Sequence, residues 1–201
     1  MNPAVLHDVH EFWFGVLEAP EDPAADKAPM WFRQDDATDA LIRDRFGVYL
    51  PEAAAASWDN LEDMPRTQQV GLIVLLDQFP RNIFRTSGEA FAYDYRALDL
   101  TARLIALGIE RYWLAERSFL FLPFMHSEEI AHQDYSVFLY AEQALTAPTN
   151  WKESFRTGVD FSTKHRDLIR KFGRFPHRNA VLGRASTPEE IAFMEKHGRG
   201  Y

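Results

Sequence analysis

Two short stretches of this 201-residue sequence combine arginine and asparagine with side chains that could bind a ligand or transfer a proton. One is LLDQFPRNIFR at 75–85, and the other is FPHRN at 175–179. A planar guanidinium donates paired hydrogen bonds to carboxylate and phosphate groups. The repeated Phe-Pro, Arg and Asn pattern therefore predicts two arms that present matched Arg and Asn pairs to one pocket. The alternative is two similar helix exits with no shared role.

Histidine and glutamate side chains near these stretches are candidates for proton transfer, because histidine titrates near neutral pH. The candidates for catalysis are His126, Glu128 and His177, and His165 is a further candidate general base. The candidates for ligand binding lie in the two arms or are expected to face inward: Asp77, Gln78, Arg81, Asn82, Gln133, His165, Arg178, Asn179 and Arg184. These residue types suit a binding site as well as an enzyme.

The sequence predicts neither a metal site nor a cofactor. It contains none of the G-x-S-x-G, P-loop, G-x-G-x-x-G and H-E-x-x-H motifs. Glu129 and His132 have the Glu-x-x-His spacing of di-iron helix bundles. Such sites need a second copy of the motif and further inward glutamates, and the sequence offers neither.

Charge is distributed unevenly along the chain. The net charge is −8, which argues against general nucleic-acid binding. Residues 151–184 hold nine Lys and Arg against three acids, a local net charge of +6. This basic segment is either a solvated helix face or a wall that faces an anionic small ligand.

The N-terminal residues and the apolar runs bear on localisation. The N-terminus has no basic region before an apolar run, so it does not resemble a signal peptide. No apolar run approaches the roughly 18 residues that a membrane span needs. The chain also has no cysteine, which excludes disulfides and thiolate sites. We expect a cytoplasmic protein with no membrane partner.

Apolar residues recur at spacings of three and four along almost the whole chain, which is typical of amphipathic helices. The predicted fold class is all-α, with residues 1–201 in a single compact helical domain. Five consecutive apolar residues at 72–76 predict a buried central helix. We expect Thr67 to cap this helix and Pro80 to end it.

Two long helices are predicted in the second half of the chain. Ser127 is expected to cap the first, and residues 151–172 form the second. At 100° per residue, Gln133 and His165 fall on the apolar stripes of these helices, whereas Glu128 falls on the outward face. The stripes therefore direct several polar side chains toward one core.

The motifs also resemble those of a known family. The resemblance lies in FWFG at 12–15, Trp31-Phe32, LLDQFPRNIFR at 75–85, FLPFMHSEE at 121–129 with Gln133, and FGRFPHRNAVLGR at 172–184. Together they are similar to bacterial domain-of-unknown-function family 924 (DUF924) over nearly the whole chain. The resemblance implies an all-helical, tetratricopeptide-like superhelical fold and no established activity.

The family resemblance implies that a set of positions is important, and this set overlaps the residues expected to face inward. Its members are Asp77, Gln78, Arg81, Asn82, His126, Ser127, Glu128, Gln133, His177, Arg178 and Asn179. It includes Glu128, which the helical-face argument directs outward. The predicted function is a polar pocket for an anionic small molecule, a carboxylate or a phosphate. The alternatives are a tetratricopeptide-like scaffold that binds a peptide or protein, and a purely structural polar core.

Overall fold

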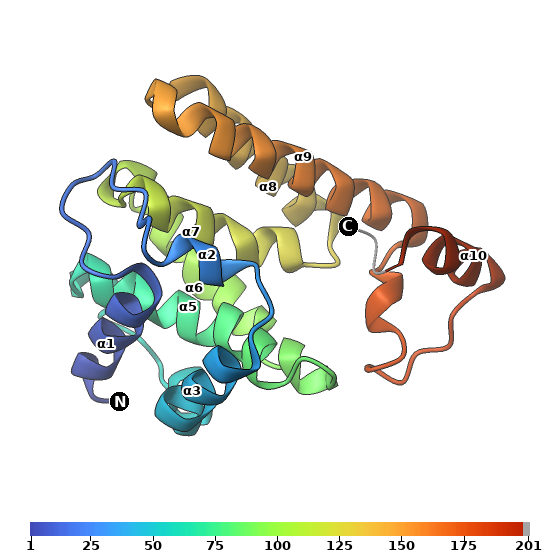
Figure 1. The fold of residues 1–201 in the computed structure, drawn as a ribbon, viewed down its shortest axis with the longest axis horizontal. Coiled ribbons are helices and arrows are strands. Elements are labelled where there is room, and N and C mark those ends of the chain that lie inside the picture. Colours follow the sequence, from blue (N-terminus) through green and yellow to red (C-terminus); the bar gives the residue numbers. More distant parts are fainter. Residues whose placement is uncertain (199–201) are drawn as a thin grey trace. The chain divides into compact units, whose positions relative to one another are not determined.

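The computed structural model describes residues 1–198, and within that range it contains helices and no strand (Figure 1). The all-α prediction is confirmed. The α-helices are α1 (Pro3–Phe14), α2 (Ala28–Trp31), α3 (Asp36–Phe46), α4 (Leu50–Ala55), α5 (Arg66–Ile83), α6 (Asp94–Ala106), α7 (Leu114–His126), α8 (Ile130–Thr146), α9 (Thr149–Phe172) and α10 (Pro188–His197). Short 3-10 turns are η1 (Gly47–Tyr49), η2 (Leu61–Asp63), η3 (Gly88–Phe91), η4 (Ile109–Arg111) and η5 (Pro176–Arg178).

The contacts between residues divide the chain into two compact units. Unit 1 comprises residues 1–85 and 89–123, and unit 2 comprises residues 86–88 together with the chain from 124 onward. The prediction of one domain over residues 1–201 stays a prediction.

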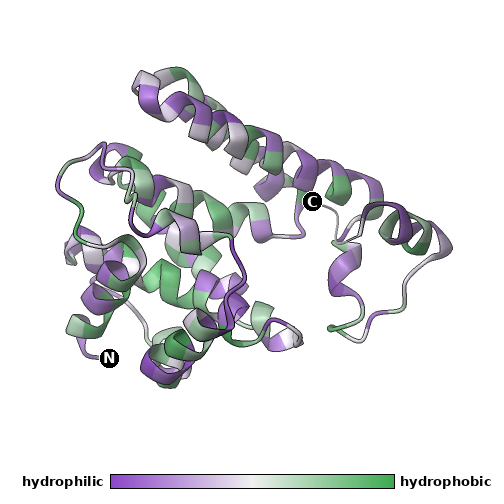
Figure 2. Cartoon of the chain, viewed as in Figure 1, coloured by the Kyte–Doolittle hydropathy of each residue, from purple (hydrophilic) through white to green (hydrophobic). Residues whose placement is uncertain are grey.

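Unit 1 is built around α5, as the apolar run at 72–76 predicts. All five side chains of that run are fully buried, and Figure 2 shows hydrophobic residues along this helix. Helix α1 lies directly against it at Gly71, where an added Cβ would stand 2.0 Å from the backbone oxygen of Leu6. Only glycine permits two helix backbones to approach so closely.

The predictions of where α5 begins and where it ends are both wrong. The helix begins at Arg66 with Pro65 at the N-cap, and Thr67 lies inside its first turn. It continues through Pro80 to Ile83, and the backbone N–H of Phe84 bonds the Pro80 oxygen at 2.8 Å. Proline removes one backbone hydrogen bond and disfavours a helical residue before it. Burial of nearly the whole helix outweighs this cost. Helix α7 likewise continues through Pro123.

Unit 2 contains α8 and α9, which pack side by side (Figure 1). Gly158 of α9 lies against Tyr140 of α8, where an added Cβ would stand 2.3 Å from the ring. Helix α9 is the longest, as predicted, and α8 begins at Ile130 rather than at Ser127. The Ser127 hydroxyl instead accepts a hydrogen bond from the N–H of Glu129 at 3.1 Å, in the turn that leads into α8.

Candidate functional site

Arg81 is held between two carboxylates of unit 1. Its Nη1 and Nη2 donate to the two oxygens of Asp94 at 2.8 and 2.9 Å, and Nη1 lies 3.5 Å from Oδ1 of Asp77. Gln78 donates to the other Asp77 oxygen at 2.6 Å. Burial lowers the pKa of Arg81, but the charges of Asp77 and Asp94 raise it by more. The net shift of this pKa is therefore upward.

Asp39 of α3 forms a second polar cluster, with side chains from the C-terminal end of α5. Asn82 donates to its Oδ1 at 2.8 Å, and Arg85 donates to both of its oxygens, including Oδ1 at 2.7 Å. The hydrogen bond to Asp39 is the main cause of the raised pKa of Arg85. With the Arg81 group, three carboxylates surround two guanidiniums. The local charge is negative, which disfavours an anionic ligand here.

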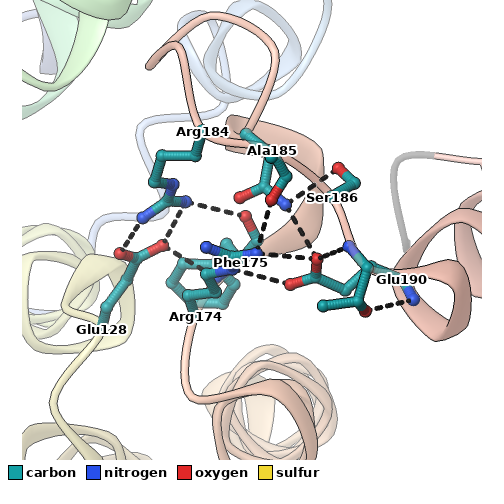
Figure 3. A network of polar contacts seen from close by, with 9 residues as sticks. Glu128, Arg174, Phe175, Arg184, Ala185, Ser186 and Glu190 are labelled. Carbon is teal, nitrogen blue, oxygen red and sulfur yellow. Dashed lines mark hydrogen bonds and ion pairs between the residues drawn. The ribbon is translucent and has the colours of Figure 1, made fainter.

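Glu128 lies at one end of a network of polar contacts in unit 2 (Figure 3). Arg184 donates to both of its oxygens at 2.6 and 3.0 Å, and the backbone N–H of Phe175 donates to Oε1 at 2.8 Å. Burial raises the pKa of Glu128, but these hydrogen bonds and the charges of Arg184 and Arg178 lower it below its usual value. The carboxylate is therefore ionised at neutral pH.

Glu190 forms the other half of this network. Arg174 donates to its two oxygens at 2.7 and 2.9 Å, and the backbone N–H of Thr187 and the amide of Asn179 donate as well. These contacts, above all the one from Arg174, lower the pKa of Glu190 to about 2. The same glutamate completes a capping box with Thr187 at the start of α10.

Arg178 adds a third guanidinium to these two ion pairs. Its side chain is buried, and the guanidinium lies over the Phe175 ring at 4.5 Å from the ring centroid. We call the five charged residues Glu128, Arg174, Arg178, Arg184 and Glu190 the Phe175 cluster. It holds three positive groups and two carboxylates. Its charge is therefore +1, opposite in sign to the charge around Arg81.

The predicted inward residues of unit 2 lie near the same loop. Gln133 is fully buried and donates to the backbone oxygens of Met125 and Ser127, both at 2.6 Å, which fixes the turn that carries Glu128. The rings of His165 and His177 each lie 5.5 Å from the Phe175 ring. The His165 ring also makes a 2.8 Å contact with the Phe161 carbonyl.

Comparison with known proteins identifies the family. The sequence model described as "Bacterial protein of unknown function (DUF924)" matches residues 9–198. The chain belongs to this family. A solved structure, a protein of unknown function called ATU0120 from Agrobacterium tumefaciens, is similar at a TM-score of 0.80 and 31% identity, with 98% of this chain and 99% of that chain covered. A comparison with curated proteins gave no match.

The candidate residues of this DUF924 protein fall into two groups. Unit 1 holds Asp77, Gln78, Arg81 and Asn82, and unit 2 holds Gln133, His165, Arg178, Asn179 and Arg184, together with the catalytic candidates His126, Glu128 and His177. The two Phe-Pro stretches differ locally, because the first is α-helical and the second is a 3-10 turn. A pocket shared by the two arms stays a prediction.

One detailed expectation about contacts is wrong. The helical-face argument directed Glu128 outward, but Glu128 precedes α8 and binds Arg184 and the Phe175 N–H. A helical angle has no meaning for a residue before the helix begins. The family resemblance included Glu128, and its role in a site stays a prediction.

Sequence reasoning missed the acidic partners of the arginines and one further polar group. The missed residues are Asp39, Asp94, Glu190 and the group formed by His10, Arg66 and Glu116. Their partners are 13 to 106 residues away in the chain, so no local pattern marks them. Residues 1–198 contain no group of three or more His, Asp or Glu arranged to hold a metal ion.

No described helix is suited to span a membrane. Among residues 1–198, none combines the length and the apolar character that such a span requires.

Proposed function

We propose that this DUF924 protein binds a small anionic molecule, a carboxylate or a phosphate, at the Phe175 cluster of unit 2. The observation that carries the proposal is the excess of one guanidinium over the carboxylates in this cluster. Burial raises the pKa of Glu128, but the hydrogen bonds from Arg184 and the Phe175 N–H, and then the charges of Arg184 and Arg178, lower it overall. An anion beside them would balance the net positive charge of the five residues.

The burial of Arg178 strengthens this argument. Only 6% of its surface is exposed, and a buried charge is costly unless an opposite charge lies close. Arg184 also has a buried Nε–H for which the described residues 1–198 supply no acceptor. A guanidinium fork suits a carboxylate or phosphate at this place.

His177 and His126 remain our candidates for proton transfer at this site. His177 follows Pro176 in η5 and precedes Arg178, so its ring belongs to the loop that carries the cluster. His126 ends α7, two residues before Glu128. Either histidine could serve a reaction of the bound anion, and neither is needed for binding itself.

The experiment compares melting temperatures in phosphate, sulfate and malonate with those in chloride at matched ionic strength. A specific anion should raise the melting temperature with a saturable dose dependence. Arg178→Lys removes the guanidinium fork but retains the charge, and it should weaken the response. The control is Arg156→Lys on the exposed face of α9, where the arginine side chain is 65% exposed.

Arg81→Lys tests the wider two-arm prediction in the same assay. Arg81 lies between Asp77 and Asp94, so we expect the variant to keep the anion response. Loss of the anion response in this variant would show that Arg81 takes part in binding the anion. If no anion shifts the melting curve of the parent protein beyond the ionic-strength effect, the proposed function fails.

A second candidate, a scaffold for a peptide partner, rests on an apolar stripe of α8. Tyr135, Phe138 and Leu145 are all exposed and recur at helical spacing, and the first two rings stack at 6.0 Å. Exposed apolar stripes mark interaction surfaces more often than isolated residues do. Amphipathic helical peptides selected against the parent protein should lose binding to Phe138→Glu. Retained binding would exclude this stripe.

A further inference from the structure

One surface depression of unit 1 is separate from the Phe175 cluster and from both Phe-Pro stretches. Its volume is ≈ 240 Å³, and five residues line it: Asp8, Glu11, Phe12, Lys27 and Arg45. Two of the five are acidic, two are basic, and Phe12 is the one uncharged residue among them. The lining therefore carries charges of both signs and no net charge.

The Phe12 ring is the fixed part of this depression. It packs edge to face against Phe46, at 5.4 Å between ring centroids, and against Phe79, at 6.0 Å. Both partner rings belong to the buried core of unit 1. Phe12 itself is half-buried and lines the depression, so the core holds an aromatic surface at this place.

The two basic groups lie over this ring. Nζ of Lys27 is 5.6 Å from the Phe12 centroid, and the Arg45 guanidinium is 5.3 Å from it and 4.8 Å from the Phe46 centroid. The Lys27 stem also passes Gly15, where an added Cβ would lie 3.5 Å from Cγ of the lysine. An aromatic ring attracts a cation but carries no charge of its own. Both cations can therefore still bind an anionic group.

The two acidic groups lie beside each other on α1. Asp8 and Glu11 are three residues apart, a spacing that makes them neighbours on the helix surface, and both are exposed. Within residues 1–198, neither these acids nor the two cations have an ion-pair partner. Four charged groups thus line one small space without pairing with one another.

We propose that this depression binds a single zwitterionic amino acid with an apolar side chain. Lys27 and Arg45 bind its carboxylate. Asp8 and Glu11 bind its ammonium group, and its side chain lies on the Phe12 ring. A ligand with one charge would bring that charge close to two groups of the same sign, which is unfavourable.

The size of the depression agrees with this ligand class. Pockets for drug-sized molecules measure about 300–1,000 Å³. The smaller space on unit 1 suits a molecule of the size of one amino acid. A peptide would extend beyond the five lining residues.

Solvated surface charges would explain each of these side chains separately. Salt screens exposed groups, and a surface without net charge attracts anions and cations equally weakly. Such a surface gives no preference for a molecule that carries both charges. The test therefore compares ligands that differ by one charge.

The experiment titrates the full-length protein with L-leucine, 4-methylpentanoate and L-leucinamide, and follows the backbone amides by NMR. The second probe lacks the ammonium group of leucine, and the third lacks its carboxylate. Leucine should shift the α1 signals of Asp8 to Phe12 and the α3 signal of Arg45 saturably. Each analogue should bind about fivefold more weakly, since one exposed ion pair contributes up to about this factor.

The variants are Arg45→Gln and Glu11→Gln, and their controls are Arg33→Gln and Glu110→Gln, at exposed residues of unit 1 outside the depression. The first two should weaken leucine binding, and the controls should leave it unchanged. If a variant does not fold, the three probes on the parent protein decide. The absence of a saturable leucine shift, or equal affinity for leucine and either analogue, would overturn the proposal, whether or not phosphate raises the melting temperature through the Phe175 cluster.

Discussion

Arg184 donates two hydrogen bonds to Glu128, at 2.6 and 3.0 Å, although 56 residues separate them in the chain. Both side chains are about three-quarters buried. This pair ties the turn before α8 to the loop that follows η5. Because the Phe175 N–H bonds the same carboxylate, one glutamate organises the loop that carries Arg178.

Replacing Glu128 should therefore destabilise the protein. Glu128→Gln keeps the size of the side chain but removes the charge opposite Arg178 and Arg184, so we expect a loss of about 1–3 kcal/mol in the free energy of unfolding. Urea denaturation measures it. The control is Glu153→Gln, because the Glu153 side chain is 82% exposed and such surface pairs contribute little. Equal stability of the two variants would contradict the described network.

Acid should weaken the contacts of Glu190. Its pKa is lowered from 4.5 to about 2 in the folded protein, so the unfolded chain binds the proton more readily. The stabilisation is present above pH 4.5 and is lost as the pH falls toward 2. Urea midpoints measured across this range should fall less steeply for Glu190→Gln than for the parent. Parallel pH profiles would show that Glu190 is not bound by Arg174.

Replacing Asp39 should lower the free energy of unfolding more than replacing Asp36. Asp39→Asn leaves Arg85 without its carboxylate partner and weakens the contact with Asn82, which should cost about 1–3 kcal/mol. Asp36 is exposed in the first turn of α3, so Asp36→Asn should cost much less. Chemical denaturation compares the two. A larger loss for Asp36→Asn would refute the Asp39 cluster.

Gly158 should not tolerate a methyl group. The Cβ of Gly158→Ala would stand 2.3 Å from the Tyr140 ring, so α8 and α9 must move apart or the ring must turn. Overpacking of this kind typically costs about 1–3 kcal/mol. Gly47→Ala is the control, since its nearest contact would be an ordinary 3.6 Å. A melting temperature equal to that of the control would contradict the close packing at Gly158.

Local patterns predicted the helices well where the signal lies within a few residues. The apolar stripe at 151–172 predicts a long helix, and α9 spans Thr149–Phe172. The run at 72–76 predicts the buried centre of unit 1. In both cases the residues that determine the helix lie close together in the sequence.

Patterns failed where distant parts of the chain decide the outcome. Pro80 normally ends a helix, but α5 continues because the rest of the chain buries it on nearly every side. Periodicity suggested that Asp77 faces inward, and the side chain is buried. It could not show that Asp94 shares Arg81, nor that Asp39 takes Asn82, because those partners are fixed by tertiary packing.

The most direct test of the anion site is the anomalous diffraction of a crystal soaked with selenate, which has the shape and charge of sulfate. The proposed function predicts an anomalous peak within hydrogen-bonding distance of the guanidiniums of Arg178 and Arg184, absent from an Arg178→Lys crystal soaked in the same way. Selenate peaks elsewhere on the protein, with none at these two arginines, would contradict it.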